Sequence, residues 1–253
     1  MLTEQRHLAI LDELQLTGRV LARELAERLQ VSEDTIRRDL RDLAARGVLQ
    51  RVHGGALPVS PALANLARRS DIAVDEKRAL GKLAASLVAD GQLVFVDGGT
   101  STLAMVQQLP PTLRATVATH SPVIAAALIE HPTVEVLMLG GRLFKHSGVA
   151  VGAGVAQAIQ SLRADGYFLG VTGVDAGFGL STGDADEAQV KALLMASAAE
   201  TVLMASSDKL GKVSPYRVAP LSALSTLLVT PQADPAALQT LRTPGLEIVV
   251  SGG

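Results

Sequence analysis

Arginine side chains gather in one short stretch near the amino end of this sequence. Residues 35–53 contain five arginines, at positions 37, 38, 41, 46 and 51, and only two aspartates. Guanidinium groups pair with phosphate oxygens and with the acceptor edge of guanine, so this local positive excess suits a surface that contacts duplex DNA. Residues 1–60 hold nine arginines against nine acidic residues, and the whole chain has a formal net charge of −2. The placement of the arginines is therefore the informative feature, although a charged run alone also fits a solvated helix face.

Helical spacing sorts the side chains around these arginines into a buried and an exposed face. If Ile36 is at the centre of the buried face, a rotation of about 100° per residue points Arg38 and Arg41 away from it. Thr35 and Arg37 then lie on the flanks. A helix in the major groove contacts bases with its amino-terminal half, so Thr35, Arg37 and Arg38 are predicted to contact DNA. Arg41 extends the same face.

Polar residues on both sides of this helix are further candidates for DNA contact. Ser32 stands at the helix start, where its hydroxyl either hydrogen-bonds a phosphate or only caps the helix, and the two roles can coexist. Arg51 and His53 alternate along an expected strand, so both side chains face one way. A basic wing tip there would lie along the DNA backbone or the minor groove. The alternative for His53 is a packing role in the adjacent turn.

Four expected strands in the later part of the chain end in glycine-rich or hydroxyl-rich turns, at residues 97–102, 119–121, 140–142 and 173–175. Ligands of open parallel sheets bind beyond the carboxyl ends of the strands, so four such turns at one edge predict a polar pocket. Gly98 and Gly99 let the backbone approach an anion closely, and the next three residues open a helix whose N–H groups would face it. The candidate pocket residues are Asp97, Gly98, Gly99, Thr100, Thr102, Thr119, His120, Gly141 and Asp175.

The elements around the arginines are those of a small winged helix-turn-helix domain. Apolar residues at helical spacing predict helices over 4–16, 19–30 and 32–46. A strand over 48–53 follows, and Gly54-Gly55 turns it into a second, short strand at 56–57. The expected domains are a winged helix-turn-helix over 1–58, a linker over 59–74 and an α/β domain over 75–253.

Strands alternate with helices throughout the larger domain. Strands are expected at 93–96, 115–118, 134–139, 167–171, 201–205, 227–230 and 247–250, and helices at 75–89, 100–109, from 122, at 152–162 and at 185–199. This alternation predicts a mostly parallel sheet covered on both faces. The expected fold is therefore α/β, with a small winged helix-turn-helix domain preceding the larger one.

Composition excludes several kinds of chemistry. The chain has no cysteine, which excludes disulfides and thiolate catalysis. The five histidines show no metal-ligand spacing, which argues against a metal-dependent hydrolase, and no cofactor is expected. No apolar run is long enough to span a bilayer, and the first ten residues lack a basic-then-apolar leader. A cytoplasmic protein without a membrane partner is expected.

Two runs of residues resemble a known family. Residues 31–40, VSEDTIRRDL, and residues 47–56, GVLQRVHGGA, are similar in order and length to the DeoR family of bacterial transcriptional regulators. The resemblance implies a regulator of transcription, usually a repressor, that binds duplex operator DNA as a homo-oligomer, either a dimer or a tetramer. It extends over nearly the whole chain.

The family resemblance also implies a ligand class for the larger domain. Sensor domains of this family resemble sugar-phosphate isomerases and respond to phosphorylated sugars or related metabolites. The loop at 97–102 matches the first loop of that family, and Lys209 matches its usual lysine, which implies a contact with phosphate. Glu187 and Lys191 resemble its Glu-Ala…Lys helix, although this spacing also fits a surface ion pair.

Three residues near the expected pocket depart from the common pattern. His120 and Thr172 stand where asparagine is frequent, and Ser206 stands where aspartate is frequent. Two rival interpretations remain at this point. One is a sugar-phosphate isomerase with an added DNA-binding domain, for which Asp97, Asp175 and Glu187 would be candidate bases. The other is an interaction module whose winged helix contacts a protein. Regulation without enzymatic activity is the expected function.

Overall fold

The computed structural model describes residues 2–252 except positions 18, 47, 53 and 59–64. The chain divides into two compact units, Met1–Leu63 and Ala64–Gly253, which are described separately below. Residues 66–70, which fall in the range expected as linker, form a helix of the second unit.

Among its described residues, the first unit has three helices and a small antiparallel sheet. Its elements are α1 (Thr3–Thr17), β1 (Val20–Leu21), α2 (Ala22–Leu29), α3 (Glu33–Ala45), β2 (Leu49–Val52) and β3 (Gly55–Pro58). The sheet has the order β1-β3-β2, so the β2–β3 hairpin is the wing. Apolar side chains from all three helices and the sheet form one core, which includes Ile10, Leu25, Ile36, Leu40 and Leu43.

One expectation for the first unit is wrong. A single helix over 19–30 was expected because Leu21, Leu25 and Leu29 follow helical spacing. In the structure Val20 and Leu21 are extended and pair with Ala56 and Gly55 of β3, and α2 begins only at Ala22. The wing hairpin offers an open strand edge, and pairing with it outweighs one further helical turn.

The second unit contains the remaining elements. They are α4 (Leu66–Ser70), α5 (Val74–Ala85), β4 (Leu93–Val96), α6 (Thr100–Val106), β5 (Thr116–Thr119), α7 (Pro122–Ala127), β6 (Glu135–Met138), β7 (Arg142–Phe144), β8 (Val149–Val151), α8 (Ala153–Gln160), β9 (Ala164–Leu169), β10 (Gly173–Asp175), β11 (Gly179–Thr182), α9 (Ala185–Ala196), β12 (Ala198–Met204), β13 (Tyr216–Ala219), β14 (Thr226–Val229), α10 (Pro235–Leu241) and β15 (Glu247–Val250), with 3₁₀ turns at Ser207–Lys209 and Leu221–Ala223.

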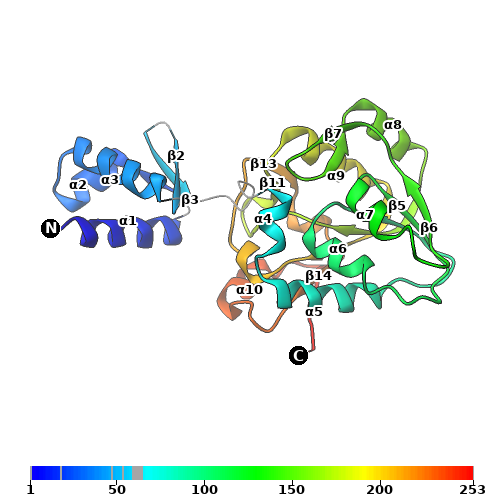
Figure 1. The fold of residues 1–253 in the computed structure, drawn as a ribbon. Coiled ribbons are helices and arrows are strands. Elements are labelled where there is room, and N and C mark those ends of the chain that lie inside the picture. Colours follow the sequence, from blue (N-terminus) through cyan, green and yellow to red (C-terminus); the bar gives the residue numbers. More distant parts are fainter. Residues whose placement is uncertain (1, 18, 47, 53, 59–64, 253) are drawn as a thin grey trace. The chain divides into compact units, whose positions relative to one another are not determined.

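A seven-stranded parallel sheet is the centre of this unit, as expected from the alternation of strands and helices (Figure 1). Its order is β15-β14-β12-β9-β4-β5-β6, and every pairing within it is parallel. One apolar core packs it against α5, α6 and α7, and a second core packs the opposite face against α8, α9 and α10. The strand order changes direction between β4 and β9, and ligands of such sheets bind at the carboxyl ends of the strands at this point.

Two smaller sheets stand beside the main one and were not expected. Strands β7 and β8 form an antiparallel hairpin, and β10, β11 and β13 form a three-stranded antiparallel sheet. The segments after Gly140 and Thr172 were interpreted as turns that close strands. They are instead the first strands of two short antiparallel hairpins, β7–β8 and β10–β11, outside the main sheet.

Candidate functional site

Helix α3 of the first unit begins with a side-chain cap. Ser32 Oγ accepts a hydrogen bond from the backbone N–H of Thr35 at 3.2 Å, and the two hydroxyl oxygens lie 2.8 Å apart. Ser32 is exposed and Thr35 is half-buried. The capping role expected for Ser32 is therefore present, and its exposed position leaves the hydroxyl accessible to a phosphate.

Replacing Ser32 by alanine is expected to destabilise the first unit by about 1 kcal/mol, because the amide of Thr35 loses its side-chain acceptor and keeps only the carbonyl of residue 32. Thermal unfolding followed by circular dichroism measures this change. Ser86→Ala, at an exposed serine whose hydroxyl donates only to the carbonyl of Leu83, is the control and should leave the first unit unaffected. Equal melting of Ser32→Ala and wild type would contradict the capping role.

The arginines of α3 differ in how they are engaged. Arg37 donates to Glu33 Oε1 at 2.7 Å, so its guanidinium is already paired on the helix surface. Arg38 and Arg41 are exposed, and the described part of the chain offers neither of them a hydrogen bond or an ion pair. Arg51 is exposed on the wing strand β2, whereas His53 lies outside the described residues. Arg38 and Arg41 are thus the most available cations of the expected DNA-binding surface.

Asp39 on the inner face of α3 is a residue that the sequence patterns did not single out. It is buried, and its two carboxylate oxygens accept hydrogen bonds from Arg6 of α1, from Nε at 2.8 Å and from Nη2 at 3.0 Å. Nε2 of His7 lies 3.3 Å from the same carboxylate. This paired contact fixes the orientation of α3 against α1, so Asp39 positions the helix that exposes Arg38.

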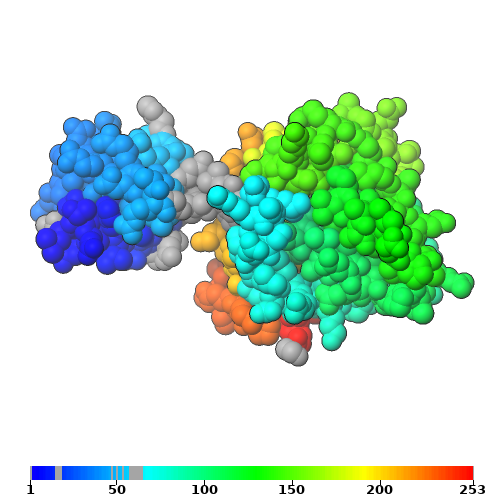
Figure 2. All heavy atoms as spheres, in the orientation of Figure 1, coloured from blue at the N-terminus to red at the C-terminus, as the bar shows by residue number. Residues whose placement is uncertain are grey.

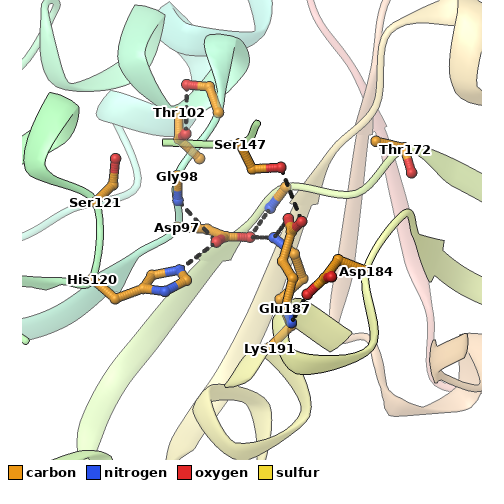
Figure 3. Close-up of polar contacts among 12 residues, drawn as sticks. Asp97, Gly98, Thr102, His120, Ser121, Ser147, Thr172, Asp184, Glu187 and Lys191 are labelled. Atoms are coloured by element: carbon orange, nitrogen blue, oxygen red, sulfur yellow. Dashed lines mark hydrogen bonds and ion pairs between the residues drawn. The ribbon is translucent and has the colours of Figure 1, made fainter. Parts of the chain in front are cut away.

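Asp97 is at the centre of the polar site in the second unit (Figure 3). It follows β4 directly and is fully buried. Oδ1 accepts from His120 Nε2 at 2.9 Å and from the amide of Gly98 at 2.8 Å, while Oδ2 accepts from Lys191 Nζ at 2.5 Å and from the amide of Gly170 at 2.9 Å. Because all four bonds are internal, Asp97 holds the loops after β4, β5 and β9 together.

His120 joins this network on the side of β5. Its Nδ1 lies 2.8 Å from the carbonyl oxygen of Ala150, and its Nε2 lies 2.9 Å from Asp97 Oδ1. Both partners only accept hydrogen bonds, so the ring satisfies both contacts when both nitrogens carry a proton. The ring is fully buried, and its two contacts link Ala150 of β8 to Asp97.

Glu187 and Lys191 complete the network from α9. Lys191 Nζ lies 3.1 Å from Glu187 Oε1 as well as 2.5 Å from Asp97, and Ser147 donates to Glu187 Oε2 at 3.0 Å. Both α9 side chains are buried, so the alternative of a surface ion pair is wrong. The reason is packing: α9 contacts strands β8, β9, β11, β12 and β13, and both of its faces are covered.

Charge pairing controls the ionisation of these groups. Burial by itself would raise the pKa of Asp97, but the ammonium of Lys191 and the hydrogen bond from His120 hold it well below its usual range. Burial would lower the pKa of Lys191, yet the carboxylates of Asp97 and Glu187 raise it. The two groups therefore form an ion pair whose charges are maintained by their mutual proximity.

Three further cations lie near this network. Lys209, from the turn after β12, points to the start of α6, with Nζ 3.4 Å from Ser101 Oγ. Lys77 of α5 donates to the carbonyl oxygens of Arg69 and Ile72, each at 2.5 Å, and so secures the end of α4. Nε and Nη2 of Arg69 are buried and have no hydrogen-bond partner among the described residues. Burial lowers the pKa of Arg69, and the carboxylates of Glu187 and Asp97 oppose that shift.

Glu76 fixes the turn that contains Lys209. Its carboxylate accepts from the amide of Ser207 at 2.9 Å, from the hydroxyl of Ser207 at 2.7 Å and from Thr230 at 2.6 Å. Burial would raise the pKa of Glu76, but these hydrogen bonds lower it overall. Ser206, one of the departures from the family pattern, donates to Asp208 Oδ1 at 2.5 Å, so a neighbouring aspartate supplies a carboxylate to this turn.

The other expected pocket residues are used in different ways. The hydroxyl of Thr102 donates to the carbonyl of Gly99 at 3.0 Å, and that of Thr119 accepts from the amide of Ser121 at 3.1 Å. A Cβ at Gly98 would overlap Cγ1 of Val149, so glycine is required for the hairpin β7–β8 to pack on this loop. Thr100 and Gly99 lie half-buried at the start of α6, and Gly141 is exposed beside β7.

Two expected residues belong to the small antiparallel sheet. Asp175 Oδ1 accepts from the amides of Gly177 and Phe178 at 2.9 and 2.7 Å, which closes the turn between β10 and β11. Thr172 is buried, and its hydroxyl lies 2.7 Å from that of Ser214. No contact within the described chain joins Asp175 to Asp97, so the structure does not bring Asp175 into the central network.

A cavity of about 330 Å³ lies between α5 and α6, next to the loop at 97–102. Its lining includes Ser70, Lys77, Arg78, Thr100 and Gln108. Within the described ranges, no group of three or more histidine, aspartate or glutamate side chains is arranged to hold a metal ion. Nor does any helix among the described residues have the length and apolarity to cross a lipid bilayer.

Two family models match the chain in succession. Residues 6–62 match the DeoR-like helix-turn-helix domain, and residues 72–230 match the DeoR C terminal sensor domain. The matched ranges correspond to the two compact units of the structure.

Similar proteins cover nearly the full length of the chain. The HTH-type transcriptional repressor GlcR of Bacillus subtilis is 31% identical over 253 residues, which is 99% of this chain and 97% of that protein. The HTH-type transcriptional regulator GlpR of Haloferax volcanii is 33% identical over 89% of each chain. The glycerol-3-phosphate regulon repressor of Escherichia coli is 26% identical over 94% of each. Among solved structures, ribose 5-phosphate isomerase A of Methanocaldococcus jannaschii matches 54% of each chain, with 16% identity and a TM-score of 0.40.

Proposed function

The chain belongs to the DeoR family of transcriptional regulators, and on this premise we propose that it represses a carbohydrate-metabolism operon under the control of a phosphorylated sugar or a related metabolite. Its full-length relatives are named regulators and repressors, and it is a regulator rather than an enzyme. The isomerase alternative is therefore not retained. In this proposal the first unit binds operator DNA, the second binds the effector, and the protein acts as a homo-oligomer.

The cations beside the glycine loop are the main support for an anionic effector. Lys209, Lys77 and Arg69 converge on the region where β4 ends and α6 begins. Two buried nitrogens of the Arg69 guanidinium, Nε and Nη2, have no partner among the described residues, and a buried unpaired donor is costly unless a ligand satisfies it. A phosphate would accept from these groups and offset their mutual repulsion.

A panel of pentose and hexose phosphates, measured against the unphosphorylated sugars, tests the effector class. A matching sugar phosphate at about 100 times its Kd is expected to stabilise the protein by about 2.7 kcal/mol, visible as a raised melting temperature. Lys209→Met should abolish most of this shift, whereas Lys82→Met, at an exposed lysine of α5, should preserve it. Absence of any shift at millimolar ligand would contradict the proposal.

Effector binding is also expected to depend on pH through Lys209. Burial lowers the pKa of Lys209 to about 8, and repulsion from Lys77 and Arg69 contributes to the shift. Only the protonated amine attracts an anion, so affinity should be constant below this pKa and fall by about tenfold per pH unit above it. Titration calorimetry between pH 7 and pH 10 measures the profile. Lys209→Met should bind weakly with a flat profile, and a flat profile for wild type would overturn the assignment.

Helix α4 follows the DNA-binding unit along the chain and contacts a hairpin that borders the proposed effector site. The amide of Leu66 donates to the carbonyl of His146 at 3.0 Å, and the next residue of that hairpin, Ser147, bonds to Glu187. A Cβ at Gly148 would lie 3.0 Å from Cδ2 of Leu66, so the hairpin and α4 are in close contact. We infer that a ligand at the 97–102 loop shifts α4 and thereby the spacing of two DNA-binding units. Unchanged spacing in structures with and without effector would exclude this route.

A further inference from the structure

Strand β6 is the most open element of the main sheet. All four of its residues are exposed, although parallel sheets are normally covered on both faces. Val136, Leu137 and Met138 are 37%, 39% and 41% exposed. Helix α7 contacts β6 without burying it. Figure 1 shows β6 at the outer edge of the sheet, and Figure 2 shows the same green edge at the molecular surface.

The exposure of β6 affects both faces of the sheet. Val134 belongs to the core under α5–α7, and Leu139 belongs to the core under α8 and α9. Side chains alternate along a strand, so Val136 and Met138 continue the first face and Leu137 continues the second. The helices on the two faces of the sheet therefore leave the side chains of β6 exposed on both faces.

The backbone of β6 is also open on its outer side. The amides of Glu135 and Leu139 donate inward, to Ala115 and Thr119, at 3.0 and 2.8 Å. By alternation Val136 and Met138 direct their N–H and C=O groups outward. Among the described strands only β5 pairs with β6. An unpaired edge with apolar side chains on both faces is a template for another strand.

We propose that β6 is the interface at which two copies of this chain pair, with the strands antiparallel and a two-fold axis at Leu137. The proposal deepens the proposed function, which requires two DNA-binding units on two operator half-sites. Centring the axis on Leu137 places Val136 opposite Met138 of the second copy and Leu137 opposite itself. Every exposed apolar side chain of the strand then meets another one.

Charge complementarity favours a second copy as the occupant. Exposed acidic residues, Glu130 and Glu135, lie at the amino end of the strand, and the exposed Lys145 follows its carboxyl end, where Arg142 is already paired with Asp186. Antiparallel pairing brings the acidic end of one strand toward the basic end of the other, and a two-fold axis repeats this match. The other edge strand, β15, is less suited, since its two central residues are half-buried.

Cysteine cross-linking tests this pairing directly, because the natural chain has no cysteine. Leu137 would lie in a non-hydrogen-bonded pair with itself, where the Cα atoms are about 4.5 Å apart, within the range of a disulfide. Leu137→Cys is expected to form a covalent dimer under mild oxidation. Leu87→Cys, at an exposed leucine after α5, is the matched control and should remain monomeric on denaturing gels. Failure of Leu137→Cys to cross-link more than the control would overturn the proposal.

Charge placed on the axis gives an independent test in solution. Leu137→Lys sets two ammonium groups against each other and is expected to convert the wild-type dimer to a monomer in sedimentation velocity. Leu137→Ser, a milder variant, should weaken the dimer with an unchanged far-ultraviolet spectrum if the first variant misfolds. A monomeric wild type, or a Leu137→Lys protein that remains dimeric, would exclude this interface. If the wild type is dimeric but does not bind operator DNA, the result would instead contradict the proposed function.

Discussion

Replacing Asp97 by alanine is expected to lower the free energy of unfolding of the second unit by about 3–5 kcal/mol. The carboxylate accepts four hydrogen bonds, and without it the ammonium of Lys191 loses one of its two buried counter-charges. The imidazole of His120 and the amides of Gly98 and Gly170 also lose their acceptor. Urea denaturation of the full chain, followed by circular dichroism, should show an earlier transition for the second unit only.

A surface ion pair in the same unit provides the matched control. Arg142 and Asp186 are bonded at 2.5 Å, but their side chains are 65% and 46% exposed. Asp186→Ala is therefore expected to change stability by at most about 1 kcal/mol. If Asp97→Ala unfolds no earlier than Asp186→Ala, the central network does not stabilise the unit. Asp97→Asn, which keeps the volume and one acceptor, should fall between the two variants.

The main sheet was predictable because each of its strands is an apolar run bounded by turn residues. Strands β4 and β15 begin and end where the pattern placed them, and the other five strands of the main sheet differ by one to three residues. The missed strands are short. Strands β7 and β8, and likewise β10 and β11, form local hairpins, whereas β1 and β13 depend on partners from another part of the chain. Strand β1 has only two residues, and β13 pairs with a strand more than thirty positions earlier. The spacing of apolar residues within a short segment does not indicate such distant pairings.

The candidate site was predictable for residues that directly follow a strand. It was not predictable for residues whose role depends on contacts with distant parts of the chain. The loop after β4 and Lys209 were predicted to bind the effector from turn chemistry and from the family resemblance, and that role stays a prediction. Arg69 lay in a segment interpreted as linker, and Asp39 lay within a charged helix that favours a solvent-exposed interpretation. Glu187 and Lys191 remained ambiguous, because an i, i+4 pair has the same spacing on a surface as in a core.

Replacing Arg38 by alanine is expected to weaken operator binding by about 1–3 kcal/mol, or roughly 5- to 150-fold. Its side chain is exposed on the outer face of α3, and the described residues give it no ion pair, so it is free to reach a base edge or a phosphate. Arg37→Ala should have a smaller effect, since Glu33 already holds that guanidinium at 2.7 Å. Fluorescence anisotropy with a labelled operator fragment, selected from genomic DNA by binding, measures both.

The salt dependence of the same binding distinguishes the two roles of Arg38. If Arg38 contacts a phosphate, Arg38→Ala weakens operator and non-operator DNA equally, and the slope of log K against log salt falls by about 1. If it contacts a base, the loss is confined to the operator. Arg28→Ala is the control, because this arginine of α2 is paired with Glu13 and lies on another helix. Operator binding by Arg38→Ala as tight as that of Arg28→Ala would show that the outer face of α3 does not enter the groove.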